Sequence, residues 1–368
     1  MKKGIPLLNK LPRLDLYIIK KFLGTYIFMI SLILSIAVVF DINEKIDKFM
    51  SNSAPLNEII FDYYVNFIPF YANLFSQLFI FLAVIFFTSK LASNSEIIAI
   101  LSNGISFKRL LRPYMISAAI IAAFTFYMGS YVIPPANETR INFENKYIDP
   151  RQRKVGDRDI QFKVGPGTIV YFGNFDIESN TGYNFSIDHF DSLRLVSRLT
   201  AQSIRYDSAY SWTIDNYQVR DFDGLEETIT RGSSIDTTIQ IVPNDFIIAK
   251  TDQQMMTTPE LTRYIRSQKE RGMGNIQAFQ IEYHSRFASI FSAFILTLMG
   301  ASISARKVKG GMGVNIGIGL GLSMAYILFM TISSSFAVKG NMSPFIAAWI
   351  PNLVFVIIAY FLYKKAPN

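Results

Sequence analysis

The chain has 368 residues, half of them hydrophobic, with 32 phenylalanines, 19 tyrosines and a formal net charge of +8. This composition is too apolar and aromatic for an ordinary soluble domain. Because the chain has no cysteine, disulfide frameworks, thiol catalysis and cysteine-ligated metals are excluded. Apolar runs of about 20 residues, long enough to cross a bilayer core of roughly 30 Å, occur at both ends of the chain, and residues 134–257 have none.

These runs predict an α-helical integral membrane protein with six transmembrane helices, three on each side of an inserted domain. Pro69 is expected to kink the second span, and Pro134 and Pro135 are expected to end the third. No small-residue cleavage site follows the first run, so we expect an uncleaved span there. The predicted spans are Phe22–Phe40, Tyr63–Ser89, Leu111–Ile133, Arg286–Ser304, Met312–Ala337 and Pro344–Tyr363.

Basic residues gather in the segments before the first span, between the second and third, between the fourth and fifth, and after the sixth. Fifteen lysines and arginines lie there with two acidic residues, Asp15 and Glu96. The positive-inside rule therefore places both termini in the cytoplasm and the inserted domain outside. The positive charge reflects this topology, so nucleic acid is not an expected partner. The predicted organisation is a membrane block over 1–133, an external domain over 134–272 and a second membrane block over 273–368.

Lys45 and Lys48 follow the first span on the external side, and Arg140 follows the third span at the start of the external domain. Positive-inside statistics make such lysines uncommon there. They are either solvated charges balanced by neighbouring carboxylates or cations that meet the phosphates of a lipid head group. Arg140 has the same two interpretations.

Residues 93–104, SNSEIIAILSNG, lie between the second and third spans and have the pattern of a short helix. Ser93 and Glu96 fit the capping box S-x-x-E. Gly104 tolerates the left-handed geometry that ends many helices, and Ser106 is expected to cap the third span. The predicted helix, 94–103, is about 15 Å long.

One face of this helix is apolar, because Ile97, Ile100 and Leu101 recur at helical spacing. This face either rests on lipid, with Glu96 serving only its own backbone, or enters a groove on a cytoplasmic partner. The residues alone leave both interpretations open.

The external domain reads as all-β. Residues 160–250 alternate polar and apolar side chains in short runs rich in aromatic and β-branched residues. This pattern predicts a sandwich or jelly roll. A helix starting at Thr258 and Pro259 and ending at Gly272 is expected to lead back to the membrane.

Two groups of residues stand out in the second membrane block. Glu282, His284 and Arg286 lie where the fourth span begins, and pairing of Glu282 with Arg286 at i, i+4 explains them. The fifth span carries a row of glycines on one helix face, which favours close packing with another helix, or a face that moves against a partner subunit. These glycines are Gly313, Gly317 and Gly321.

Several chemistries are missing from the sequence. It has no G-x-x-x-x-G-K-[ST] phosphate loop, and its two histidines, His189 and His284, lie far apart without ligand-spaced partners. The cores of the predicted spans carry no charged residue, whereas ion-coupled transporters usually need one near the midplane. We therefore expect no catalytic residue, metal or cofactor in this chain and an energy source in a partner. The alternatives are a membrane-bound lipid-modifying enzyme and a permease for another lipid or a lipoprotein.

The chain resembles the lipopolysaccharide-export ABC transporter permeases (LptF/LptG, also YjgP/YjgQ) over nearly its whole length. The resemblance rests on LDLYIIKKF before the first span, SEIIAILSNGIS, YVIPP closing the third span and IEYHSRF entering the fourth. LDLYIIKKF favours the LptG-like member.

The resemblance implies a bacterial inner-membrane protein that pairs with a second homologous permease and binds a cytoplasmic ATPase dimer, which holds ATP and magnesium. It implies that a periplasmic jelly roll passes lipopolysaccharide to a bridge protein, and that spans 1 and 5 line lateral openings of a cavity. Lys45, Lys48 and Arg140 are then expected near lipid phosphates. The segment 94–103 becomes the coupling helix, in which Glu96 matches the family's glutamate. The residues expected to contact the ATPase are Ser95, Glu96, Ile97, Ile100, Leu101 and Gly104.

Overall fold

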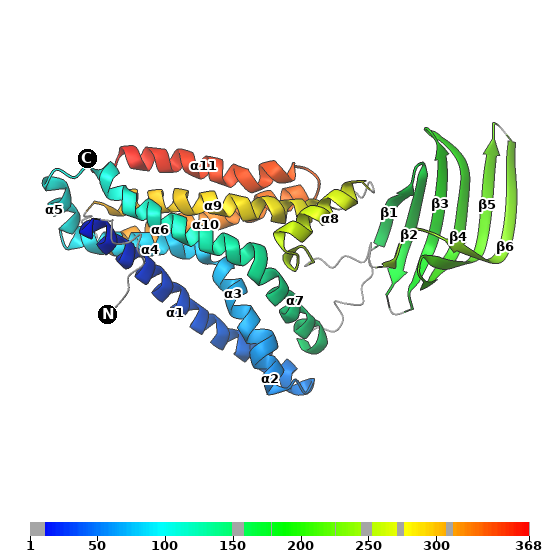
Figure 1. The fold of residues 1–368 in the computed structure, drawn as a ribbon, viewed down its shortest axis with the longest axis horizontal. Coiled ribbons are helices and arrows are strands. Elements are labelled where there is room, and N and C mark those ends of the chain that lie inside the picture. The colour runs from blue at the N-terminus through cyan, green and yellow to red at the C-terminus, as the bar shows by residue number, and fades with distance from the viewer. Residues whose placement is uncertain are drawn as a thin grey trace. The chain divides into compact units, whose positions relative to one another are not determined.

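The computed structural model of the chain describes residues 12–148, 158–177, 179–224, 226–243, 252–270, 276–306 and 312–367. The chain divides into two compact units. One comprises Met1–Arg140 and Gln277–Asn368, and the other Ile141–Ile276. The first unit is helical and the second contains the strands (Figure 1).

Six helices of the described residues are long and apolar enough to cross a membrane, which confirms the predicted number. The first unit also contains short helices and wider, π-type turns. Its elements are α1 (Arg13–Ser51), α2 (Leu56–Glu58), η2 (Ile59–Tyr64), α3 (Val65–Leu74), α4 (Ser76–Ser93), α5 (Glu96–Ser102), α6 (Phe107–Tyr127), η3 (Met128–Val132), α7 (Ile133–Phe143), α9 (Gln277–Ser304), α10 (Met312–Val338) and α11 (Pro344–Lys364).

The prolines of the second and third spans lie within helical segments. Pro69 lies inside α3, and the second span is interrupted at Phe75, between α3 and α4. Pro134 and Pro135 do not end the third span, because they occupy the first turn of α7 directly after η3. Each of the two prolines lacks a backbone N–H, so the continuous helix forgoes a hydrogen bond at each of them.

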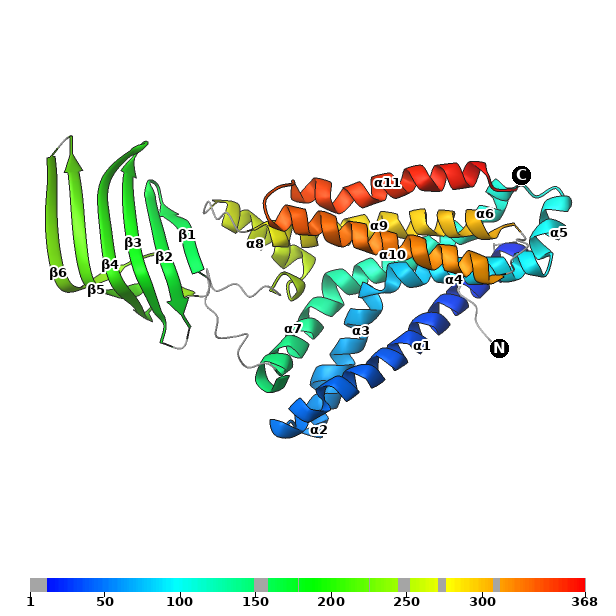
Figure 2. The ribbon, with the colours of Figure 1, turned by 180° about the vertical axis from the view of Figure 1, so that it is seen from behind.

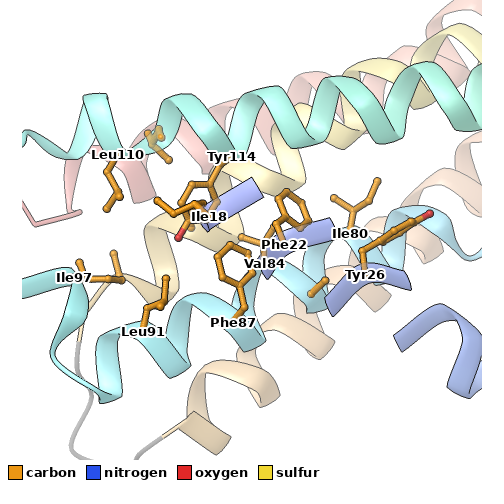
Figure 3. Packing of buried hydrophobic residues seen from close by; sticks show 14 of the residues in the cluster. Ile18, Phe22, Tyr26, Ile80, Val84, Phe87, Leu91, Ile97, Leu110 and Tyr114 are labelled. Carbon is orange, nitrogen blue, oxygen red and sulfur yellow. The ribbon is translucent and has the colours of Figure 1, made fainter. Parts of the chain in front are cut away.

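The core of the membrane unit lies where α1, α4, α5, α6 and α9 meet. Phe22 of α1 stacks on Phe87 of α4 with ring centroids 5.5 Å apart, and Phe87 stacks on Tyr114 of α6 at 5.1 Å. Figure 3 shows these rings in one cluster with Ile18 and Ile97. Burial differs between the helices. In the most apolar stretch of α4, 67% of the residues are buried, whereas in that of α1 only 17% are buried.

Beyond this core, α1 diverges from the long bundle. Its outer half runs beside α3, away from α9, α10 and α11 (Figures 1 and 2). Polar side chains fix the other helices: Asn352 of α11 donates to the carbonyl of Ala288 at 2.8 Å and accepts from Tyr326 of α10 at 2.8 Å. Such hydrogen bonds join helices where no water competes. Trp349 of α11 packs on Phe291 at 5.0 Å.

The second unit contains an antiparallel sheet with neighbours in chain order, β1 to β6. Buried Phe172, Phe185 and Ile204 line one face with Trp212, which is fully buried and donates to the carbonyl of Ile241 at 3.1 Å. The all-β insertion is confirmed, and the strands of the described residues form this single sheet. The strands are β1 (Arg158–Gly165), β2 (Thr168–Asp176), β3 (Thr181–Asp191), β4 (Arg194–Ser208), β5 (Ser211–Asp223) and β6 (Glu226–Thr238).

The second unit also holds η4 (Glu144–Ile148), η7 (Asp252–Gln254) and α8 (Thr258–Glu270). Helix α8 starts where the sequence predicts, and its predicted end at Gly272 lies outside the described residues. The Thr257 hydroxyl and N–H donate to Glu260 at 2.6 and 2.9 Å, closing the first turn. These hydrogen bonds lower the pKa of Glu260.

Candidate functional site

The short helix between the second and third spans is present as α5, but it starts differently from the prediction. Helix α4 extends to Ser93, so Ser93 cannot cap α5. The chain turns at Asn94 and Ser95, where Ser95 has a φ of +61° and makes no capping hydrogen bond. Glu96 is therefore the first helical residue, and the predicted capping box is wrong.

Glu96 instead joins α5 to the start of α1. The Tyr17 hydroxyl donates to Oε2 of Glu96 at 3.1 Å, and the amide of Asn94 donates to Oε1 at 3.2 Å. Both carboxylate oxygens thus have partners within the chain. The interpretation that Glu96 serves only its own helix backbone is not what the structure shows.

The apolar face of α5 packs inward. Ile97 is 1% exposed in the core cluster (Figure 3), and the half-buried Ile100 and Leu101 pack against that cluster. Ile97 is therefore covered by the chain's own core, because an amphipathic pattern predicts a buried face without identifying what buries it. For Ile100 and Leu101, which are partly exposed, contact with a partner stays a prediction. The outward residues of α5 and its N-cap are Ser95, Ile98, Ala99 and Ser102, and Ile98 is 52% exposed.

The end of α5 agrees with the sequence. The helix stops at Ser102, and Gly104 takes a φ of +82°, with its N–H donating to the carbonyl of Leu101 at 3.0 Å. A residue with a Cβ would be strained at this φ. Ser106 then caps α6 as predicted, accepting from the N–H of Arg109 at 3.3 Å.

An ion pair beside α5 was not expected from the sequence. Arg109 of α6 donates from both terminal nitrogens to the two oxygens of Asp15 in α1, at 2.8 and 2.9 Å. The Asp15 side chain is fully buried, whereas that of Arg109 is 36% exposed. A sequence signal for this pair exists. Asp15 and Glu96 are the two acidic residues among the basic flanks of the spans, and both make their contacts where α1, α5 and α6 meet.

At the far end of α1, Lys45 is paired within the chain. Its ammonium lies 2.7 Å from Oδ1 of Asp41 and donates to the Tyr63 hydroxyl, and Tyr64 donates to the other Asp41 oxygen at 3.1 Å. The pairing with Asp41 supports the interpretation of Lys45 as a charge balanced by a neighbouring carboxylate. Lys48, one turn further on, is exposed.

Arg140 is also engaged within the chain. It is 6% exposed, donates to Oδ1 of Asn137 at 2.9 and 2.7 Å, and lies over the ring of Phe70 at 4.7 Å. Arg140 thereby fastens α7 to α3, and of the three candidate phosphate-binding cations only Lys48 is exposed.

At the start of the fourth span, Arg286 donates to Oε1 of Glu282 at 2.9 Å, which confirms the predicted i, i+4 pair. The His284 ring packs edge-on against Phe345 at 5.4 Å. Within the described ranges, no group of three histidine or carboxylate side chains could hold a metal ion.

The glycine row of α10 faces away from the other residues that the structure describes. A Cβ at Gly313, Gly317 or Gly321 would meet nothing within 4 Å, whereas a Cβ at Gly319 would overlap Cδ1 of the buried Ile85 in α4. The close helix contact inside the chain is therefore made by Gly319. The predicted glycine face is left open to lipid or to another subunit.

Leucine at Gly319 is expected to lower the free energy of unfolding by about 1–3 kcal/mol, the usual cost of overpacking. Leucine at Gly317 should not lower it, because the site is open and glycine is the weaker helix former. Thermal unfolding of both variants in the same detergent checks this. Equal destabilisation of the two variants would contradict the assignment of the two faces.

Comparison with known proteins supplies the family. The family model described as lipopolysaccharide export system permease LptF/LptG matches residues 16–365. A search among curated proteins finds no match. The matched residues include both membrane blocks, the inserted sheet, and the contact between the start of α1 and α5. The chain therefore belongs to the LptF/LptG family of lipopolysaccharide export permeases.

Proposed function

We propose that the chain is the transmembrane permease subunit of an ATP-driven transporter that extracts lipopolysaccharide from the inner membrane and passes it to a periplasmic bridge protein. The family match over residues 16–365 carries this proposal, because it includes all six apolar helices and the inserted sheet together. The chain contributes no ATP-binding loop of its own, so hydrolysis falls to a cytoplasmic ATPase dimer with its ATP and magnesium.

The orientation follows from charge. The start of α1, helix α5 and the end of α11 lie at one end of the helical unit (Figures 1 and 2). Basic residues dominate the start of α1, the first turns of α6 that follow α5, and the end of α11, which supports a cytoplasmic position for this end. Both termini are then cytoplasmic, and the sheet of the second unit is periplasmic.

In this proposal α5 is the coupling helix. It is a short helix outside the six spans, its inner face is packed into the chain's own core, and its outer face offers Ile98, Ala99 and Ser102. An exposed isoleucine beside small residues suits a shallow apolar contact with the ATPase. Gly104 ends the helix, and Glu96 anchors its first turn.

The open faces of α1 and α10 suit a second permease and lipid. Large apolar side chains are more than 40% exposed on both helices, among them Phe28 at 66%, Phe40 at 70% and Leu328 at 61%. The Gly313, Gly317 and Gly321 face of α10 adds room for close helix contact. Exposed Lys48 is the cation best placed to meet lipid phosphates.

Purification of the tagged chain in mild detergent is expected to recover an ATPase and a second permease with it. The reconstituted complex should release lipopolysaccharide to a bridge protein only when ATP is hydrolysed. A Glu96→Lys chain should lose at least tenfold in release, because it reverses the charge that fixes the first turn of α5. Recovery of the chain alone, or full release by Glu96→Lys, would contradict the proposal.

A further inference from the structure

The first turns of α1 are joined to α5 and α6 by two polar contacts. The Asp15–Arg109 ion pair is bidentate, with distances of 2.8 and 2.9 Å, and the Tyr17–Glu96 hydrogen bond is 3.1 Å long. Because Asp15 is completely buried, its carboxylate is stable only while Arg109 remains in place. The ion pair therefore fixes this end of α1 against α6.

Apolar packing strengthens the same junction. Ile18 and Phe22 of α1 are fully buried and share one core cluster with Ile97 of α5 and Leu110 of α6 (Figure 3). The capping of α6 by Ser106 holds the backbone of Arg109 in place. The residues Arg13–Tyr26, which we call the α1 root, are thus packed as one body with α5 and the start of α6.

The rest of α1 is held differently. Beyond Tyr26, whose hydroxyl lies 2.6 Å from that of Ser76, one side of the helix is exposed, from Ile27 at 60% to Phe40 at 70%. The far end is joined to η2 by the Asp41–Tyr64 hydrogen bond. The outer part of α1 and the η2–α3 segment therefore form an arm beside the bundle (Figure 2), and the α3–α4 interruption at Phe75 lies at its base.

We propose that Asp15, Tyr17 and Arg109 are positioning residues that make the α1 root move with α5, so that a displacement of α5 tilts the arm formed by α1 and α3. This inference rests on the proposed function, in which the ATPase acts on α5. The tilt converts a movement at the cytoplasmic surface into a change in the apolar face that α1 presents to lipid or to a second permease.

The test uses the absence of cysteine in the chain, since engineered cysteines then label single positions. Spin labels at Lys21→Cys in the α1 root and Ile98→Cys in α5, both exposed positions, report their distance by pulsed electron resonance. In the Asp15→Asn/Tyr17→Phe chain the width of this distance distribution is expected to at least double. The matched control is Asp47→Asn/Tyr127→Phe, which makes the same chemical changes at exposed residues remote from α5.

Function is measured on the unlabelled complex as lipopolysaccharide released per ATP hydrolysed. The Asp15→Asn/Tyr17→Phe chain should lose at least tenfold in this ratio, while ATPase recovery and hydrolysis stay within twofold of the control. The exposed Tyr17→Phe change alone, which leaves the buried pair intact, should give a smaller loss of the same kind. An unchanged ratio, or a parallel loss of ATPase recovery, hydrolysis and release, would overturn the proposal.

Failure of the proposed function gives a different result. No ATPase would then co-purify with the unmodified chain. The distances between the spin labels can still be measured in the chain alone. A distance distribution as narrow in the Asp15→Asn/Tyr17→Phe chain as in the control would overturn the anchorage itself.

Discussion

Replacing Arg109 with methionine is expected to lower the free energy of unfolding by about 3–5 kcal/mol, because the fully buried carboxylate of Asp15 then loses its counter-charge. Methionine keeps most of the apolar stem of arginine, so the loss reports charge more than packing. Thermal or denaturant unfolding of the detergent-solubilised chain measures the effect. The control is Arg112→Met, one turn along α6 at an exposed position, which should change stability by less than about 0.5 kcal/mol.

The ion pair also predicts an asymmetry between its two partners. Asp15→Asn leaves no buried charge, and the 36% exposed Arg109 side chain can turn to water. Its expected cost is about 1–3 kcal/mol, as for a lost charged hydrogen bond. Combining Asp15→Asn with Arg109→Met should recover part of the loss caused by Arg109→Met alone. A double variant as unstable as the sum of the single variants would show that the two charges do not interact.

Replacing Ile98 with aspartate is expected to weaken ATPase binding at least tenfold, corresponding to about 1.4 kcal/mol or more, without unfolding the permease. The side chain is 52% exposed on the outer face of α5, so the free chain tolerates a carboxylate there. In the complex the same carboxylate would enter an apolar contact without a partner. Co-purification and titration of the ATPase onto the immobilised permease measure this loss.

The adjacent residue supplies the opposite control. Ile97→Ala removes a side chain that is 1% exposed in the core cluster and should cost about 2–5 kcal/mol of stability. ATPase affinity of the chain that remains folded should change little. If Ile97→Ala weakened binding and Ile98→Asp did not, the inward and outward faces of α5 would be assigned the wrong way round.

Local features of the fold could be predicted from the sequence. Apolar runs set the six spans, and Gly104 and Ser106 mark the end of α5 and the start of α6, because each signal acts through its own helix. The alternation of residues in the insertion likewise marks its strands, and each strand pairs with the next one in the chain.

Most of the errors concern contacts distant in sequence. Helical spacing separates Ile97 from Ile98, but only the packing of α1, α4 and α6 around α5 shows that the chain's own core covers Ile97. Asp15 and Arg109 are 94 residues apart, so no local pattern joins them. Gly319 and Gly317 are distinguished only by the position of Ile85. Continuation of the helix through Pro134 depended on η3, a wider turn without a sequence signature.

The two tryptophans of the chain are divided between its two units. Trp212 is fully buried in the sheet, and Trp349 packs among phenylalanines in α11. Each unit therefore carries one intrinsic fluorophore. With Trp349 replaced by phenylalanine, emission follows the sheet alone, and with Trp212 replaced it follows the helical unit alone. The order in which the two units melt, and whether one melts with the other, can thus be read optically in the intact chain.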